Sequence, residues 1–400
     1  MRIALYHNLP SGGAKRAVFE WVRRLAVEDT IDVYSLATAD HSFCDVRPFV
    51  SKHKVYEFSS RRSFRSPFGR INHLQRWRDL GDLDRLQQKI ATEINAGGYD
   101  IVFANTCAFT FVPAILKYID IPSVYYLHEP FGPGLERVDS RNVPSHRSWR
   151  HTVDHYDPFK ELYWDRLHLI QRQSMQKTGK LLANSHFTAQ CNQAVFGRES
   201  TFCPLGVDLN DFQPIPGSSR EEFVFSVGEM SLRKGFDFLI ESLAKIPADR
   251  RPQLKLACNS VKSGELDYIN ELAHRTRVDV QVLYKLDVAK LRDYYNRARL
   301  CVYTPIREPF GLVPLEAMAC GTPVVGVREG GVMESIVHER TGLLVERDPD
   351  RFAAAIQSLL ANPGLAETYG RNAREHVVQN WSWDRSVSLL SSQLKSACLN

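Results

Sequence analysis

Residues 303–331 decide the fold, and they read YTPIREPFGLVPLEAMACGTPVVGVREGG. Two carboxylates, Glu308 and Glu316, stand in this stretch with seven residues between them. The apolar run that ends at Gly321 predicts a helix, and the β-branched run VVGV shortly after it predicts a strand. The predicted order of loop, helix, turn and strand is the repeating unit of a doubly wound α/β sheet.

Gly311 lies where the predicted loop becomes the helix. A helix start presents unpaired backbone N–H groups and the positive end of the helix dipole, and both favour a phosphate. Glu308 precedes this point and Glu316 follows it by about one turn. Carboxylates on both sides of an anion site suit hydrogen bonds to a sugar on one side and a ribose on the other. Taken singly, each is better explained as a solvated loop charge or as a carboxylate in an early helical position.

The run EPFGLVPLEAMACGTPVV resembles the sugar-donor motif of retaining glycosyltransferases of family 4, which have the GT-B fold. That motif is a Glu, seven residues and a second Glu, followed by A-x-A-x-G-x-P-V-V. The resemblance implies two doubly wound Rossmann-like domains that face each other across a cleft, with the donor mainly on the second. It also implies a UDP- or GDP-sugar donor, a glycan or lipid-linked acceptor, retention of configuration, and neither metal nor cofactor.

The chain opens with a strand, a glycine turn and a helix. Residues 2–7 have strand character, and the apolar residues of 14–25 recur at helical spacing. Between them, Gly12 and Gly13 let a ligand approach the backbone closely, although a plain tight turn explains them equally well. In the resembling family this loop faces the cleft. Further strands are predicted at 31–36, 99–105, 123–127 and 181–184, and helices around 83–94, 112–118 and 161–178 and from 185 onward.

Polar residues end two of these predicted strands. Asn105 ends the strand at 99–105, and His128 and Glu129 follow the strand at 123–127. Such residues point into the ligand crevice of open α/β sheets. In the resembling family a histidine in this place contacts the transferred sugar, so His128 is a candidate catalytic residue, with a hydrogen-bonded core histidine as the alternative. Glu129 and Asn105 are candidates for acceptor binding.

The second domain opens with a strand at 223–227 and a loop from Gly228 to Gly235. Lys234 resembles the family's diphosphate-binding lysine, and it joins His128 and Glu308 as a candidate catalytic residue. The family usually has an arginine where this chain has Glu229, so one cation of the phosphate clamp is missing there, and Arg233 is its alternative source. The residues assigned to the donor are Gly12, Gly13, Gly228, Arg233, Lys234, Glu308, Phe310, Gly311, Leu312, Val313 and Glu316.

Residues 209–220 have the Pro, Gly and Ser content of a linker. We therefore expect an N-terminal acceptor-binding domain at 1–208 and a C-terminal nucleotide-sugar-binding domain at 221–380. The resemblance implies that residues 381–400 form a helix that crosses back to the first domain. Further strands are predicted at 254–258, 278–283, 300–303 and 342–345, and helices at 236–244, 265–275, 286–298, 350–360, 365–379 and 384–396.

The composition favours a packed cytoplasmic protein. The 400 residues are 44% hydrophobic and 24% charged, with a net charge of +5. The eight cysteines form no C-x-x-C pair, so we interpret them as reduced thiols that bind no zinc. Polar residues interrupt the apolar N-terminus and residues 101–119, so neither a signal peptide nor a membrane span is predicted.

Residues 58–78 form a basic segment with interleaved aromatic residues and no Asp or Glu. Its arginines are Arg61, Arg62, Arg65, Arg70, Arg76 and Arg78. This composition predicts binding to an anionic membrane surface, and a solvated, partly packed insertion explains it equally well. Nothing else indicates a nucleic-acid module. Residues 131–158 are irregular, and we interpret them as a mobile acceptor loop.

Two other functions remain open. A nucleotide-sugar epimerase shares the predicted architecture, and a non-catalytic nucleotide-sugar-binding subunit would account for Glu229. A phosphorylase would need a lysine that binds pyridoxal phosphate, for which we find no candidate. Glycoside hydrolysis is disfavoured, because the sequence shows no pair of carboxylates that must act as acid and nucleophile.

Overall fold

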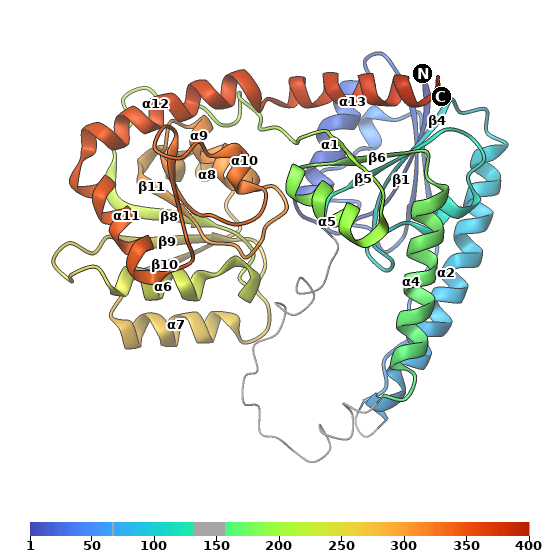
Figure 1. Ribbon diagram of the computed structural model, residues 1–400, viewed down its shortest axis with the longest axis horizontal. Helices are drawn as coiled ribbons and strands as arrows, with labels where there is room; N and C mark the ends of the chain where they lie inside the picture. The colour runs from blue at the N-terminus through green and yellow to red at the C-terminus, as the bar shows by residue number, and fades with distance from the viewer. Residues whose placement is uncertain (66–67, 131–156, 400) are drawn as a thin grey trace.

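The computed structural model describes residues 1–65, 68–130 and 157–399. Within these residues the chain forms two parallel sheets, and we call the unit around each sheet the first and the second domain (Figure 1). The strand order is β3-β2-β1-β4-β5-β6-β7 in the first and β10-β9-β8-β11-β12-β13 in the second. In both, the order reverses beside the opening strand, β1 or β8, which is the doubly wound topology that the sequence predicts.

The first domain begins with a strand and a helix, as predicted. Its strands are β1 (Arg2–Asn8), β2 (Thr30–Leu36), β3 (Lys52–Tyr56), β4 (Ile101–Cys107), β5 (Ser123–Leu127), β6 (Lys180–Ala183) and β7 (Thr201–Phe202). Its helices are α1 (Gly13–Leu25), α2 (Asn72–Asn95), α4 (Lys160–Lys177) and α5 (His186–Phe196). The edge strands β3 and β7 were not predicted, because β3 is half exposed and β7 has only two residues.

The helix predicted at 112–118 is instead the 3₁₀ turn η3 (Ala114–Tyr118). The backbone is already extended at Ile119, where φ is −82° and ψ is 130°. Pro122 then biases the residue before it, Ile121, away from the α conformation. The segment is therefore too short to form a full helix before β5 begins.

The second domain repeats the strand–loop–helix unit. Its strands are β8 (Glu221–Val227), β9 (Gln253–Cys258), β10 (Val280–Tyr284), β11 (Ala298–Tyr303), β12 (Val324–Val327) and β13 (Gly342–Val345). Its helices are α6 (Phe236–Ala244), α7 (Glu265–Thr276), α8 (Val288–Arg297), α9 (Leu312–Ala319), α10 (Val332–Ser335), α11 (Pro349–Ala361) and α12 (Pro363–Asn380), with the 3₁₀ turn η5 (Leu232–Lys234) before α6.

The last helix, α13 (Trp383–Ala397), packs on α1, β4 and β5 of the first domain, so the chain crosses between the domains a second time (Figure 1). Trp21 of α1 donates a hydrogen bond to Ser386 of α13. The crossing passes directly over Gly206, where a Cβ atom would lie 2.4 Å from the backbone nitrogen of Trp383. Glycine is required there because two backbones meet.

The central strands are buried on both faces, which explains their nearly continuous apolar sequences. Every residue of β4 and of β5 is buried. Trp21 packs against Tyr126 of β5, with ring centroids 4.5 Å apart, and against Phe103 of β4. This core fixes the carboxyl ends of β4 and β5, where the candidate residues Asn105 and His128 lie.

The described residues of the basic segment 58–78 run along an arm that α2 and α4 form, from Phe58, whose ring packs on Phe109, to the start of α2 at the far end of the arm (Figure 1). Arg61 pairs with Asp79 and Asp82, and Arg76 pairs with Asp79, so acidic residues on α2 neutralise part of the segment. Arg62 and Arg65 are exposed, as are Phe64 (42%) and Phe68 (60%).

Parts of these regions lie outside the described residues. They are residues 66–67, the side chain of Arg70, and residues 131–156, which include most of the predicted acceptor loop. In the part of the chain that is described, no helix is long and apolar enough to cross a membrane.

Candidate active site

The helix start predicted at Gly311 is present. Gly311 is the N-cap of α9 with φ of 96°, a left-handed conformation that favours glycine, and a Cβ atom there would lie 3.1 Å from the hydroxyl oxygen of Tyr303. The amides of Leu312 and Val313 therefore open the helix, where helix amides lack intrahelical acceptors. The glycine turn of the first domain faces this point, because a Cβ on Gly13 would lie 3.5 Å from Leu312 Cδ1.

Lys234 and Glu308 form an ion pair inside the second domain. The ammonium donates to both carboxylate oxygens, at 2.8 and 2.9 Å. Burial alone would raise the pKa of Glu308, but Lys234, with help from Arg233, lowers that pKa below its usual value. Glu308 is therefore ionised at neutral pH.

Close backbone packing holds these two side chains in place. The 3₁₀ turn η5 that carries Lys234 packs tightly on the loop after β11. A Cβ on Gly235, where φ is 64°, would lie 2.4 Å from the carbonyl oxygen of Thr304. The amide of Ile306 donates to the carbonyl of Arg233 at 2.8 Å. The loop that carries Glu308 and the turn that carries Lys234 are thus joined by their backbones.

Arg233 extends this pair across the cleft between the domains. Its guanidinium lies 3.5 Å from the carboxylate of Glu129 in the first domain. Glu129, Arg233, Lys234 and Glu308 therefore gather at one place, with two charges of each sign, and we call them the charge cluster. Glu229 is not part of it, because its carboxylate accepts from Ser260 at 3.1 Å and lies 3.8 Å from the ammonium of Lys262.

His128 lies below the cleft surface and is 4% exposed. Its Nε2 lies 2.9 Å from Asn105 Oδ1, so the imidazole donates to the amide oxygen, and its ring packs against those of Trp21 and Tyr126. Burial lowers the pKa of His128 to about 3, and the ring is neutral. The geometry is that of a hydrogen-bonded core histidine.

Asn105 is fully buried, so in this arrangement it orients His128 and does not reach the open cleft. Its assignment to the acceptor stays a prediction. Phe310 is also in the core, at 3% exposure, where its ring packs on Trp381. A donor could therefore contact only the backbone of Phe310 in this arrangement.

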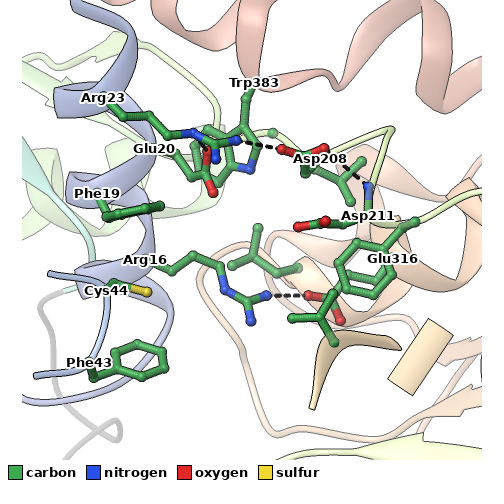
Figure 2. A pocket seen from close by; sticks show the side chains of 15 residues that line it. Arg16, Phe19, Glu20, Arg23, Phe43, Cys44, Asp208, Asp211, Glu316 and Trp383 are labelled. Carbon is green, nitrogen blue, oxygen red and sulfur yellow. Dashed lines mark hydrogen bonds and ion pairs between the residues drawn. The ribbon is translucent and has the colours of Figure 1, made fainter. Parts of the chain in front are cut away.

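Glu316 is buried and bound at both oxygens. Arg16 of α1 donates to Oε1 at 2.7 Å (Figure 2). The hydroxyl of Tyr295 donates to Oε2 at 2.9 Å. Burial raises the pKa of Glu316, although Arg16 and Tyr295 oppose it. Sequence reasoning missed Arg16. Its place on the first turn of α1, directly after the glycine turn that faces the cleft, was the available signal.

A cavity of about 220 Å³ opens beside this ion pair between the two domains (Figure 2). Arg23 pairs with Glu20 and Asp208 along the same wall, while Arg16 reaches across to Glu316. The cavity therefore borders the carboxylate that the sequence assigns to the ribose. Among the described residues, no group of three or more His, Cys, Asp or Glu side chains is placed to hold a metal ion.

Two family profiles cover most of the chain. Residues 11–211 match Glycosyltransferase Family 4, and residues 209–376 match Glycosyl transferases group 1. The D-inositol 3-phosphate glycosyltransferase 2 of Catenulispora acidiphila is 35% identical over 206 residues, which cover 46% of this chain and 48% of that protein. The alpha-maltose-1-phosphate synthase of Mycolicibacterium smegmatis is 33% identical over 197 residues, 46% and 48% of the two chains. The chain thus spans about half the length of these relatives.

Solved structures match over nearly the whole chain. Sucrose-phosphate synthase of Thermosynechococcus elongatus has a TM-score of 0.74 at 22% identity, covering 99% of this chain and 98% of that one. HepE of Anabaena in complex with UDP and glucose has a TM-score of 0.74 at 21% identity, covering 99% and 100%. These matches and the two sheet topologies confirm the predicted GT-B fold.

Proposed function

The chain belongs to glycosyltransferase family 4, and from this premise we propose that it transfers a sugar from a nucleotide-sugar to a hydroxyl of a glycan or lipid-linked acceptor. We propose further that the transfer retains the anomeric configuration and needs no metal. The observation that carries the proposal is the charge cluster beside the start of α9, at the cleft between the domains. HepE is described with UDP and with UDP-glucose, which makes a UDP-sugar the first donor to test.

In the proposed reaction, the bond between the anomeric carbon and the phosphate oxygen breaks while the acceptor oxygen bonds to that carbon. Negative charge develops on the leaving diphosphate, which takes up the acceptor's proton. Lys234, Arg233 and the amides of Leu312 and Val313 are the donors for this charge, and preorganised donors of this kind are usually the largest catalytic contribution. When the diphosphate binds Lys234, it frees Glu308 for the hydroxyls of the sugar.

The test is incubation of the full chain with a panel of UDP- and GDP-sugars, with detection of free nucleotide and of the sugar product. Slow release of nucleotide in water, which an acceptor accelerates, supports a transferase. Tight binding without release would support the non-catalytic subunit. A changed sugar that stays attached to its nucleotide would support the epimerase.

The ion pair between Arg16 and Glu316 gives a first prediction. If Glu316 binds the ribose, the nucleotide must displace Arg16 from Oε1 or share that oxygen with it. We therefore expect Arg16→Gln to bind the nucleoside diphosphate several-fold more tightly, because a charged hydrogen bond no longer competes. Calorimetry measures this, with Arg385→Gln, an exposed position on α13, as the matched control. Weaker binding by Arg16→Gln would indicate that Arg16 itself contacts the nucleotide.

We also propose that the end of the α2–α4 arm binds an anionic membrane surface. Exposed Phe64 and Phe68 can insert among lipids, while Arg62 and Arg65 face the headgroups. Arg61 and Arg76 contribute less, because Asp79 and Asp82 neutralise them. This assignment is narrower than the sequence prediction, which counted all six arginines of the segment alike.

The double variant Arg62→Ser with Arg65→Ser should bind vesicles that contain anionic phospholipid roughly 30-fold more weakly, from about 1 kcal/mol for each arginine. Its binding should also depend less on salt. Arg250→Ser with Arg371→Ser, two exposed arginines of the second domain, removes the same charge elsewhere and should change nothing. The idea is wrong if the unmodified protein ignores anionic vesicles at low salt.

A further inference from the structure

The first turn of α5 is completed by a side chain of the other domain. Ser185 is the N-cap, and its hydroxyl accepts from the amide of Thr188 at 3.0 Å. The backbone amides of His186 and Phe187 donate to the two carboxylate oxygens of Glu334, each at 2.9 Å. Glu334 belongs to α10 of the second domain, which faces α5 (Figure 1). The positive end of the helix dipole favours this carboxylate as well.

The start of α5 is bonded to the candidate histidine. Asn184, directly before the N-cap, is buried, and its side-chain amide donates to the carbonyl oxygen of His128 at 2.8 Å. The segment 184–187 therefore holds the backbone of His128 at one end and the carboxylate of Glu334 at the other.

The start of α10 is bonded in turn to the candidate carboxylate Glu308. The amide of Glu334 donates to the carbonyl oxygen of Gly331 at 3.0 Å. The amide of Gly331 in turn donates to the carbonyl oxygen of Glu308 at 2.9 Å. A Cβ on Gly330 would lie 2.4 Å from that same carbonyl oxygen. Because no side chain separates these backbones, a displacement of α10 must displace Glu308 as well.

A second contact joins the same two places. The guanidinium of Arg307, next to Glu308, lies 5.5 Å from the ring centroid of Phe187 in a cation–π arrangement. The loop that carries Glu308 thus meets the start of α5 directly through Arg307 and indirectly through Glu334.

We propose that Glu334 is a positioning residue that couples closure of the two domains to the alignment of His128 with Glu308. This inference rests on the proposed function, which gives Glu308 to the transferred sugar, and on the sequence prediction that His128 contacts the same sugar. When the domains separate, the amides of His186 and Phe187 and the carboxylate of Glu334 return to water. When the domains close, one carboxylate joins the segment that holds His128 to the loop that holds Glu308.

Two ion pairs also join the domains among the described residues, but they cannot serve this purpose while the donor is bound. Arg16 pairs with Glu316, and Arg233 pairs with Glu129, but the proposed function gives Glu316 and Arg233 to the nucleotide-sugar. The donor therefore competes with both pairs. Glu334 and the amides of α5 are assigned to no substrate, so their contact can form together with a bound donor.

The test compares Glu334→Gln with a control variant, Glu339→Gln. Glu339 is an exposed glutamate between α10 and β13 of the same domain. Glu334→Gln loses the charge and turns an amide NH₂ group toward backbone donors. We expect its kcat to fall roughly 10-fold or more, the lower end for a hydrogen bond to a charged group. Its affinity for the nucleoside diphosphate should fall less than its kcat, because the resemblance assigns the nucleotide mainly to the second domain.

Two readouts do not depend on transfer. With UDP bound, the amides of His186 and Phe187 in the unmodified protein should exchange hydrogen slowly, and small-angle scattering should show contraction. Glu334→Gln should lose the slow exchange and the contraction, while its melting temperature stays unchanged. A lower kcat with unchanged exchange and contraction would overturn the coupling, as would behaviour identical to that of Glu339→Gln. If the unmodified protein transfers no sugar, loss of protection and contraction in Glu334→Gln would reject the proposed function and retain the closure contact.

Discussion

Glu308→Gln is expected to reduce turnover roughly 10- to 150-fold while affinity for the nucleoside diphosphate is kept. The proposed role of Glu308 is a hydrogen bond to the transferred sugar, whose ring gains positive charge as the bond to phosphate breaks. A hydrogen bond to a charged group contributes about 1.5–3 kcal/mol, which gives this range. Because the contact strengthens toward the transition state, its loss lowers kcat more than it changes binding.

The ion pair with Lys234 sharpens this expectation. In the absence of donor, Lys234 donates to both oxygens of Glu308, so the incoming diphosphate must compete with that carboxylate. Removal of the charge at Glu308 removes the competition, and the nucleoside diphosphate should bind Glu308→Gln at least as tightly as the unmodified protein.

Glu316→Gln is the matched comparison within the same motif. It should weaken binding of the donor and of the free nucleoside diphosphate alike, with a smaller effect on kcat, because the ribose hardly changes during the reaction. Calorimetry and steady-state kinetics measure the two variants together, with the exposed Glu346→Gln as the control. If Glu308→Gln loses nucleotide affinity and Glu316→Gln keeps it, the two roles are reversed.

Lys234→Ala should lower kcat roughly 100-fold or more, which is the usual loss when one preorganised donor to a developing charge is removed. It also leaves the half-buried Glu308 without its ammonium partner, so burial then raises the pKa of Glu308. The carboxylate then protonates at a higher pH than in the unmodified protein. The acidic limb of the pH–rate profile should therefore shift to higher pH in Lys234→Ala.

Arg233→Ala should lower kcat less, roughly 10-fold, because Arg233 is shared with Glu129, whereas Lys234 is bonded to both oxygens of Glu308. Lys245→Ala, a half-exposed lysine that follows α6, controls for the loss of one positive charge. Equal losses at Lys234 and Arg233 would show that both hold the diphosphate. A larger loss at Arg233 would overturn the assignment of the clamp to Lys234.

The strands and helices that position the site were predictable from sequence because their signals are local. The period of apolar residues, the glycine at the start of α9 and the proline-rich linker each act within a few residues of the chain. Gly311 is the N-cap where the sequence places it, and Lys234 meets Glu308 because two strand–loop–helix units bring their loops to one sheet edge. The parallel order of the sheets follows from the same repeated units.

Other contacts between residues far apart in the chain were decided only by the tertiary structure. The burial of His128 and Asn105, the pairing of Arg16 with Glu316, and the carboxylate of Glu334 on the amides of α5 each join parts of the chain that carry no mutual signal in one sequence. Strand periodicity predicts that His128 ends β5, but whether its ring faces the cleft or the core depends on how Trp21 and Tyr126 pack around it. The direction of a side chain at a strand end is set by its neighbours in space, and those neighbours come from three different elements.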